Sequence, residues 1–197
     1  DENAKMEYRQ YYASVLLRKE ECEKAAEVCN EILREDDGYY PAYIIRQEAY
    51  YKLGRAQEVI DDYYRAVEIY AGFCQPYLFA AEVFLDYGQY EDAMGILKQA
   101  GENQVEFTAK MRLCEIRLLR GMAKNRGDRR EIRKRLDKLQ KELEEGAASD
   151  LEDKSELEFE QGMLWWEDGK RKEALACIER AIEQNPERPQ YRLACGD

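Results

Sequence analysis

The chain has 197 residues, of which 37% are charged and 45% hydrophobic, and its formal net charge is −11 at pH 7. It has no histidine, so the commonest general base and the commonest metal ligand among side chains are both missing. No run of about 18 apolar residues suggests a membrane-spanning helix, and the amino terminus lacks the basic and then apolar pattern of a secretion signal. These features favour a soluble protein without a histidine-based active site.

The six cysteines are scattered along the chain without a C-x-x-C pair, and several occupy apolar positions of helical patterns. A thiol at such a position serves as a small hydrophobic side chain. We therefore expect reduced thiols and a cytoplasmic location, where disulfides rarely persist. We expect no metal and no cofactor.

A short motif that ends in glycine repeats along the chain. Residues 50–54 (YYKLG) recur 34 positions later as residues 84–88 (FLDYG), and residues 165–169 (WWEDG) form a third copy. A period of 34 residues is the signature of helix-turn-helix units that bury their apolar faces by stacking on neighbours. Placing each glycine at the turn between two helices predicts units at residues 6–39, 40–73, 74–107 and 155–188.

Small and large side chains occupy fixed positions within these units. Helices that approach closely need a small side chain at the contact, and bulky side chains fill the space that remains. Positions eight, twenty and twenty-seven hold Ala13, Gln47, Ala81, Gly162, then Ala25, Val59, Ala93, Ala174, then Ile32, Ala66, Ala100, Ala181. The large positions, eleven and twenty-four, hold Leu16, Tyr50, Phe84, Trp165, then Cys29, Tyr63, Leu97, Ile178.

This pattern resembles the tetratricopeptide repeat (TPR) family, which has small, aromatic and glycine residues at these offsets and a proline near the end of the unit, as at Pro186. The resemblance implies an all-α, right-handed superhelical solenoid of helix-turn-helix hairpins. Tyr43 and Tyr77 fit a position at which the family usually has an aromatic residue, whereas the chain has Arg9 and Glu158 in the other units. Glu20 stands where the first unit should have its turn glycine.

Residues 108–154 break the 34-residue period and predict an enlarged fourth unit. One apolar stripe runs along residues 111–122, and a second consists of Ile132, Leu136, Leu139 and Leu143. We read residues 125–128 as the turn between the two helices, with Asp128 as the N-cap of the second, and residues 146–150 as a loop. The expected architecture is a single domain over residues 1–197 with about five hairpins, ten or eleven helices, and the start of a terminal helix. Because the chain starts without methionine and stops near that helix, we expect it to be a segment of a longer protein.

The charge is distributed unevenly. Residues 1–105 carry 21 acidic and 11 basic side chains, whereas residues 110–141 carry 13 basic and 4 acidic ones. The basic residues could engage an acidic peptide, a phosphorylated partner or nucleic acid, or they could form a solvated helix face or pair with a neighbouring acidic helix. The candidate basic patch consists of Arg126, Arg129, Arg130, Arg133, Lys134 and Lys138.

The resemblance implies that the first helix of each unit lines an inner groove. Those positions combine apolar side chains with carboxylates, which suits a peptide or protein partner with apolar anchors and some positive charge. The candidate partner-binding residues in the second and third units are Glu48, Tyr51, Lys52, Leu78, Glu82, Leu85 and Asp86. An equally ordinary interpretation is that some of these side chains only cover the next helix.

Two adjacent tryptophans in the last unit cannot share one face of a helix. The register predicts that Trp165 is buried and that Trp166 lies on the inner side with Phe159 and Met163. Trp166 is then either a partner-binding residue or the seat of a following helix.

We find no nucleophile elbow, phosphate loop, zinc spacing or dinucleotide fingerprint, and no strand pattern. We therefore predict that the chain is not an enzyme but a protein–protein interaction scaffold that binds a peptide or partner protein on its concave face. The alternative is an architectural or oligomerising segment, or contact with nucleic acid or an acidic partner through the basic helix at residues 126–141. We expect no membrane contact and consider nucleic acid the less favoured partner.

Overall fold

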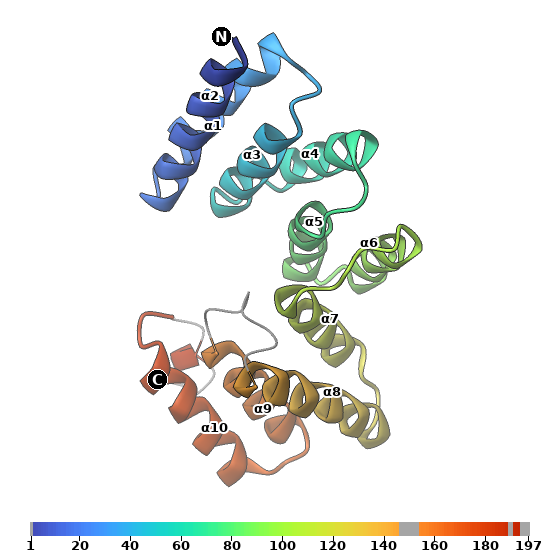
Figure 1. Cartoon of the computed structure of the whole chain (residues 1–197). Coiled ribbons are helices and arrows are strands. Elements are labelled where there is room, and N and C mark those ends of the chain that lie inside the picture. Colours follow the sequence, from blue (N-terminus) through green and yellow to red (C-terminus); the bar gives the residue numbers. More distant parts are fainter. Residues whose placement is uncertain (1, 146–153, 189–190, 194–197) are drawn as a thin grey trace. The chain divides into compact units, whose positions relative to one another are not determined.

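The computed structural model describes residues 2–145, 154–188 and 191–193. These residues are helical and contain no strand. The helices are α1 (Glu2–Arg18), α2 (Cys22–Glu35), α3 (Tyr40–Lys52), α4 (Ala56–Ile69), α5 (Gln75–Asp86), α6 (Tyr90–Glu102), α7 (Ala109–Met122), α8 (Arg126–Glu144), α9 (Ser155–Glu167) and α10 (Arg171–Gln184) (Figure 1). No helix in the described part of the chain is both long and apolar enough to cross a membrane.

The predicted glycine turns between paired helices are confirmed. Gly54, Gly88 and Gly169 have φ angles of 70°, 68° and 76°, a left-handed conformation that glycine adopts without steric cost. After each of them, the next backbone N–H donates to a carbonyl five residues back, as Arg55 does to Tyr50 at 2.9 Å, which is the Schellman pattern. Glu20 makes the same turn with φ 62°, although it has a side chain.

The positions that the repeat reserves for small side chains are buried. Residues 25, 59, 93 and 174, and residues 32, 66, 100 and 181, have no exposed surface. Gly162 makes a close contact, because a Cβ there would lie 2.7 Å from Cγ1 of Ile178. Gln47 is buried as well, but it is large and polar. Its amide donates to the carbonyls of Val59 at 3.2 Å and Pro76 at 3.1 Å, and these hydrogen bonds connect α3 to α4 and to the start of α5.

The chain divides into two compact units, residues 1–106 and residues 107–197. We call them the N-terminal unit and the C-terminal unit. In the N-terminal unit α1 packs on α2, α3 on α4 and α5 on α6, and α3 also contacts both α1 and α5. The first helices of the three hairpins therefore lie next to one another (Figure 1).

The C-terminal unit is built on the predicted leucine stripe. Ile132, Leu136, Leu139 and Leu143 of α8 are buried together with residues of α7 and α9, and α9 packs on α10. The backbone of residues 191–193 is also helical. The loop predicted at residues 146–150 lies outside the described residues.

The predicted start of α8 was wrong. Its N-cap is Asn125, whose side-chain oxygen accepts from the backbone N–H of Gly127 at 2.7 Å and of Asp128 at 3.1 Å. Asp128 is instead the third helical residue, and its carboxylate accepts from the backbone N–H of Lys124 at 3.0 Å. Both residues therefore stabilise the start of α8: Asn125 caps the first N–H groups of the helix, and Asp128 binds the backbone that precedes it.

Candidate partner-binding site

Tyr51 joins two hairpins of the N-terminal unit at their first helices. It lies near the end of α3, half-buried, and its ring centroid is 5.7 Å from that of Phe79 on α5. The hydroxyl donates to Oδ2 of Asp86 at 3.3 Å. Burial raises the pKa of this hydroxyl well above its ordinary value, and the carboxylates of Glu82 and Asp86 raise it further. Tyr51 therefore stays neutral beside two carboxylates.

A pocket of about 160 Å³ opens beside this tyrosine. Its lining includes Tyr51 and Asp86, the buried side chains of Val59 and Val83, and the exposed ring of Tyr87. Arg55 also lines the pocket, and its guanidinium is paired with Glu58 at 2.6 Å. An apolar floor with a carboxylate at the edge can accept an apolar group that ends in a positive charge. The sequence singled out Tyr51 and Asp86, but it did not predict this pocket.

The remaining predicted residues of the N-terminal unit have different environments. Glu48 and Lys52 form an ion pair of 3.2 Å along α3, Leu85 is half-buried, and Leu78 is buried with 7% exposed. Leu78 therefore contributes to packing more than to an outer surface. We use "the Tyr51 surface" for Glu48, Tyr51, Lys52, Glu82, Leu85 and Asp86.

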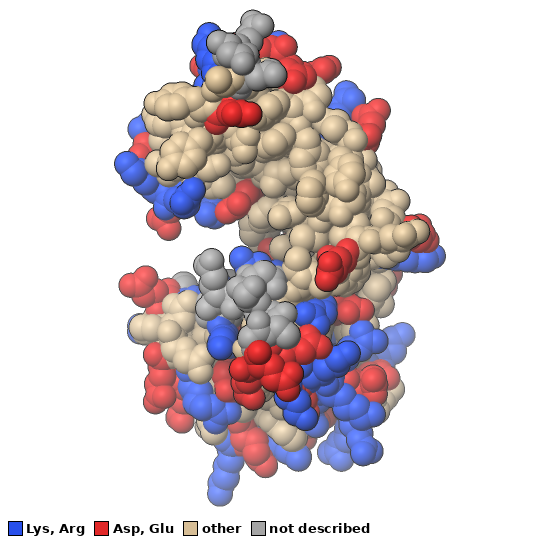
Figure 2. Space-filling model, in the orientation of Figure 1, with Lys and Arg blue, Asp and Glu red and all other residues tan. Residues whose placement is uncertain are grey.

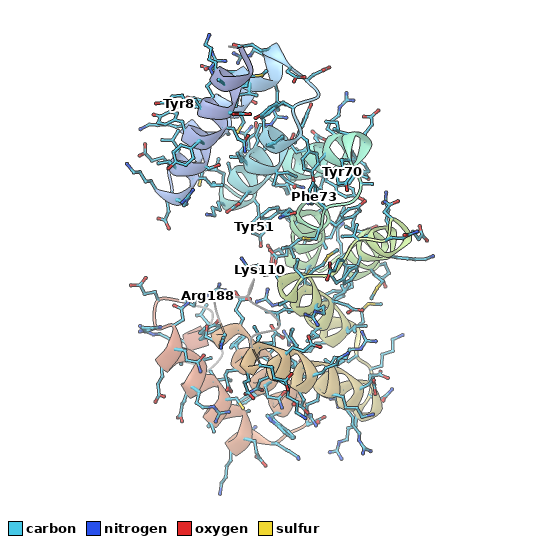
Figure 3. The ribbon with its side chains drawn as sticks, viewed as in Figure 1. Tyr8, Tyr51, Tyr70, Phe73, Lys110 and Arg188 are labelled. Carbon is cyan, nitrogen blue, oxygen red and sulfur yellow. The ribbon has the colours of Figure 1, made fainter. Side chains whose placement is uncertain are left out.

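Exposed aromatic side chains on α1 add to the accessible surface of the same unit. Tyr8, Tyr11 and Tyr12 lie at helical spacing and are 70%, 63% and 47% exposed. The face of this unit seen in Figure 2 has few charged side chains, and Figure 3 shows Tyr8 and Tyr51 on the side where α1, α3 and α5 lie. The sequence indicates this concentration of aromatic side chains, because 14 of its 15 tyrosines precede residue 91.

A second aromatic cluster forms at the connection between α4 and α5. Tyr70 and Phe73 are 52% and 50% exposed, with ring centroids 5.0 Å apart, and each also contacts the ring of Tyr40. Figure 3 shows both side chains at this connection. The register of the repeat gave no signal for them, because they lie between helices.

Trp166 belongs to the C-terminal unit, where it lies on α9 with 43% of its surface exposed. The guanidinium of Arg171 is 5.7 Å from its ring centroid. Trp165, predicted to be buried, is half-buried, and the cations of Arg133 and Lys170 lie 3.8 Å and 4.2 Å from its ring centroid. Two cations therefore pack against the ring of Trp165.

The residues of the candidate basic patch have different partners and different exposure to solvent. Arg129 and Arg133 each donate to the carboxylate of Asp168 at 2.6 Å, and thereby fasten α8 to the end of α9. Lys134 pairs with Glu131 at 3.0 Å and Lys138 with Glu142 at 3.9 Å, both along α8. Arg126 and Arg130 are exposed. Arg129 and Arg133 therefore stabilise the packing of the C-terminal unit.

The same helices also hold a buried ion-pair network. Glu160 is 3% exposed and accepts from Arg117 at 3.2 Å and from Arg120 at 2.8 Å. Burial opposes the charge on Arg120, but Glu160 and Glu167 outweigh that effect and raise its pKa. Two further arginines of the basic region therefore bind the acidic helix α9, as one of the alternative interpretations of the sequence proposed.

Neither a protein-family model nor a curated protein matches the chain. Among solved structures, a thermophilic TPR protein of Thermus thermophilus is similar, with a TM-score of 0.70, 18% identity and 96% of both chains covered. A chain of the APC/C hetero-tetramer Cut9–Hcn1 gives a TM-score of 0.83 at 12% identity, with 96% of this chain but 35% of that chain covered. YrrB, described as a TPR protein with an unusual peptide-binding site, gives 0.55 at 16% identity, with 96% and 91% covered.

These similarities agree with the helical hairpins, the left-handed glycine turns and the buried small residues described above. They confirm the all-α repeat architecture that the sequence predicted. The chain has the tetratricopeptide-repeat fold.

Proposed function

We propose that the chain is a protein–protein interaction module without catalytic activity, which binds a peptide or partner protein on the Tyr51 surface. The similarity to TPR proteins supports an interaction scaffold in general. The observation that carries the specific proposal is the position of Tyr51, which is half-buried, bonded to Asp86 at 3.3 Å, and part of the wall of an apolar pocket.

The chemistry of this surface favours a partner with apolar anchors and positive charge. Glu48, Glu82 and Asp86 bring three carboxylates to the Tyr51 surface, against one cation, Lys52. The cation in the pocket wall, Arg55, is paired with Glu58 at 2.6 Å. Residues 1–105 carry 21 acidic and 11 basic side chains, so their long-range field also attracts a basic partner. Apolar groups of the partner would enter the pocket beside Tyr51, where Val59 and Val83 form the floor.

Tyr51 is expected to contribute more affinity than its neighbours. Tyrosine is enriched among the residues that dominate interfaces, because it combines a large apolar ring with one polar group. Its contact with Phe79 and its bond to Asp86 hold the ring in one place, so little side-chain entropy is lost when a partner binds.

The test is binding of a peptide library to the full chain and to two variants of this surface. Tyr51→Ala removes the anchor, and Glu82→Lys reverses one charge. Matched controls are Tyr64→Ala, an exposed tyrosine on α4, and Glu91→Lys, an exposed carboxylate on α6. We expect both surface variants to lose the selected peptides by about tenfold or more, while the controls retain them. Equal binding by all five proteins would rule out this surface.

The result also separates the proposal from its alternative. If the selected ligands are acidic and depend on α8 instead, the interaction belongs to the C-terminal unit. Binding to nucleic acid would weaken steeply with salt, whereas apolar anchoring on the Tyr51 surface would change little.

A further inference from the structure

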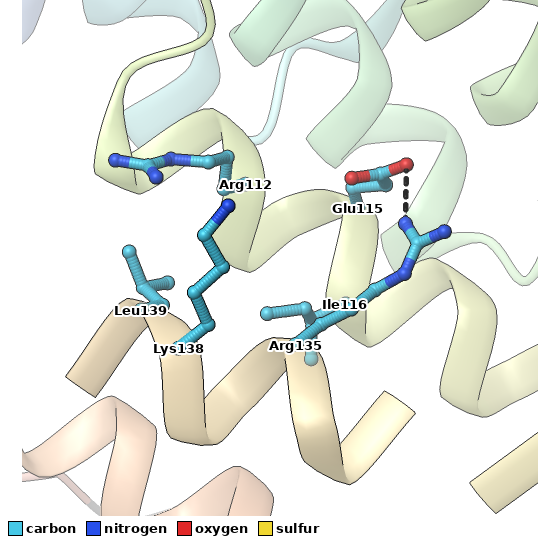
Figure 4. A pocket seen from close by; sticks show the side chains of 6 residues that line it. All are labelled: Arg112, Glu115, Ile116, Arg135, Lys138 and Leu139. Carbon is cyan, nitrogen blue, oxygen red and sulfur yellow. Dashed lines mark hydrogen bonds and ion pairs between the residues drawn. The ribbon is translucent and has the colours of Figure 1, made fainter. Parts of the chain in front are cut away.

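A pocket of about 250 Å³ lies between α7 and α8 in the C-terminal unit. It is lined by Arg112, Glu115, Ile116, Arg135, Lys138 and Leu139 (Figure 4). Ile116 and Leu139 are buried members of the core, so the pocket has an apolar floor. The charged ends of the other four side chains surround it.

Positive charge exceeds negative charge around this pocket. Arg135 donates to Glu115 at 2.9 Å, while Arg112 and Lys138 share the carboxylate of Glu142. Three cations are therefore balanced by two carboxylates. A guanidinium has five N–H donors, and each of the two arginines donates one of them in these bonds, so both keep donors for a second acceptor.

These cations have a different environment from the arginines that bind α9. The side chains of Arg129 and Arg133 are 16% and 17% exposed where they bind Asp168. Those of Arg135 and Lys138 are 47% and 79% exposed, and that of Arg112 is intermediate at 32%. Exposed ion pairs contribute about 1 kcal/mol or less to stability, so a ligand can exchange them without loss of the fold.

We propose that this pocket binds a phosphoryl ester on an apolar stem, such as a phosphorylated aromatic side chain of a partner. The phosphoryl oxygens accept from Arg112 and Arg135, Lys138 adds a third positive charge, and the stem lies against Ile116 and Leu139. A dianionic phosphoryl group competes better than a single carboxylate for cations that already face Glu115 and Glu142. Two planar guanidinium groups from adjacent helices also suit its several oxygens.

The experiment titrates the full chain with phenyl phosphate and follows the methyl NMR signals of Ile116 and Leu139. Benzoate replaces the phosphoryl group by a carboxylate, inorganic phosphate lacks the stem, and benzyl alcohol lacks the charge. We expect phenyl phosphate to bind most tightly, with benzoate weaker and the other two weaker by about tenfold or more. Benzoate as the tightest ligand, or signals that move elsewhere in the chain, would overturn the proposal.

Variants separate this pocket from general attraction to a basic helix. Arg135→Gln and Lys138→Gln change exposed side chains of the pocket, and Arg130→Gln and Lys134→Gln change exposed cations of α8 outside it. Only the first pair should weaken phenyl phosphate, by about tenfold, with thermal midpoints close to that of the unchanged protein. Equal weakening by both pairs would contradict a defined pocket and indicate a general polyanion surface. Neither outcome bears on the Tyr51 surface, which lies in the other unit.

Discussion

The hydroxyl of Tyr51 on α3 lies 3.3 Å from Oδ2 of Asp86 on α5, so that one hydrogen bond joins two successive hairpins at the candidate site. The two residues are 35 positions apart, one residue more than the repeat length. The repeat therefore brings a tyrosine of one unit beside a carboxylate of the next. The same bond links the fold to the proposed function, because it holds the ring of Tyr51 at the pocket.

Replacing Gly162 by alanine should destabilise the C-terminal unit. The new Cβ would lie 2.7 Å from Cγ1 of Ile178 and 3.2 Å from the carbonyl oxygen of Ala174, and overpacking of this kind costs about 1–3 kcal/mol. Gly95 of α6 is the matched control, since a Cβ there meets nothing within 4 Å. Gly95→Ala should raise the free energy of unfolding by up to about 1 kcal/mol. Urea denaturation measures the free energy of unfolding of both variants, which should fall for Gly162→Ala and rise for Gly95→Ala. The same change in both variants would show that α9 and α10 are not in close contact at Gly162.

Glu20→Gly should stabilise the first hairpin. Glu20 has a φ of 62°, and a residue with a side chain pays about 1 kcal/mol to adopt this conformation. The complementary change, Gly88→Ala, should destabilise by a similar amount, because Gly88 has a φ of 68° and open space around it. Thermal unfolding measures both. A loss of stability in Glu20→Gly would mean that contacts of the Glu20 side chain stabilise the fold by more than the left-handed backbone destabilises it.

The stability of the C-terminal unit should fall in acid because of Asp168. Burial raises the pKa of this carboxyl, but the hydrogen bonds from Arg129 and Arg133 outweigh burial and leave the pKa below its ordinary value of 3.8. The stabilisation is therefore present above about pH 4 and is lost as the pH falls through the lower pKa of the folded state. Asp168→Asn should cost about 2 kcal/mol at neutral pH and should flatten the decline below pH 4. If the free energy of unfolding of Asp168→Asn fell in acid as steeply as that of the unchanged chain, Asp168 would not be the cause of the decline.

Cys29 should make the N-terminal unit less stable in alkali. Burial raises the pKa of this thiol from 9.0 to about 12, so the folded chain keeps the thiol protonated while the unfolded chain ionises. The associated stability is present below pH 9 and is lost between pH 9 and about 12. Cys29→Ala should make the free energy of unfolding less dependent on pH in that interval. In native protein, a thiol-alkylating reagent should modify the less buried Cys74 well before Cys29.

The repeat architecture was predictable because it depends on local and periodic requirements. Left-handed turns need glycine at positions 54, 88 and 169, and close helix contacts need small residues such as Ala25 and Ala93, so the sequence carries both signals directly. The start of α8 was misplaced because Asn125 and Asp128 are both good N-cap residues, and a single sequence does not show which one faces the free backbone N–H groups.

Pairings between distant residues were not predictable. The sequence showed that Arg129 and Arg133 are basic, but their partner Asp168 is 39 and 35 residues away. The two arginines also lie in the enlarged unit, where the 34-residue period is broken. The pockets beside Tyr51 and between α7 and α8 depend on the packing of several helices at once. Tyr51 and Asp86 were nevertheless singled out, because the resemblance to the TPR family implies which positions of each first helix line the inner groove.

The most direct test of the Tyr51 surface is a charge exchange at Asp86. Isothermal titration compares a peptide that alternates lysine with phenylalanine and its counterpart with glutamate in place of lysine, using the unchanged chain and Asp86→Lys. Glu91→Lys supplies the control for a general change of charge. The account predicts that the unchanged chain and the control prefer the lysine peptide, and that Asp86→Lys loses this preference by about tenfold or more. The same preference in all three proteins would contradict it.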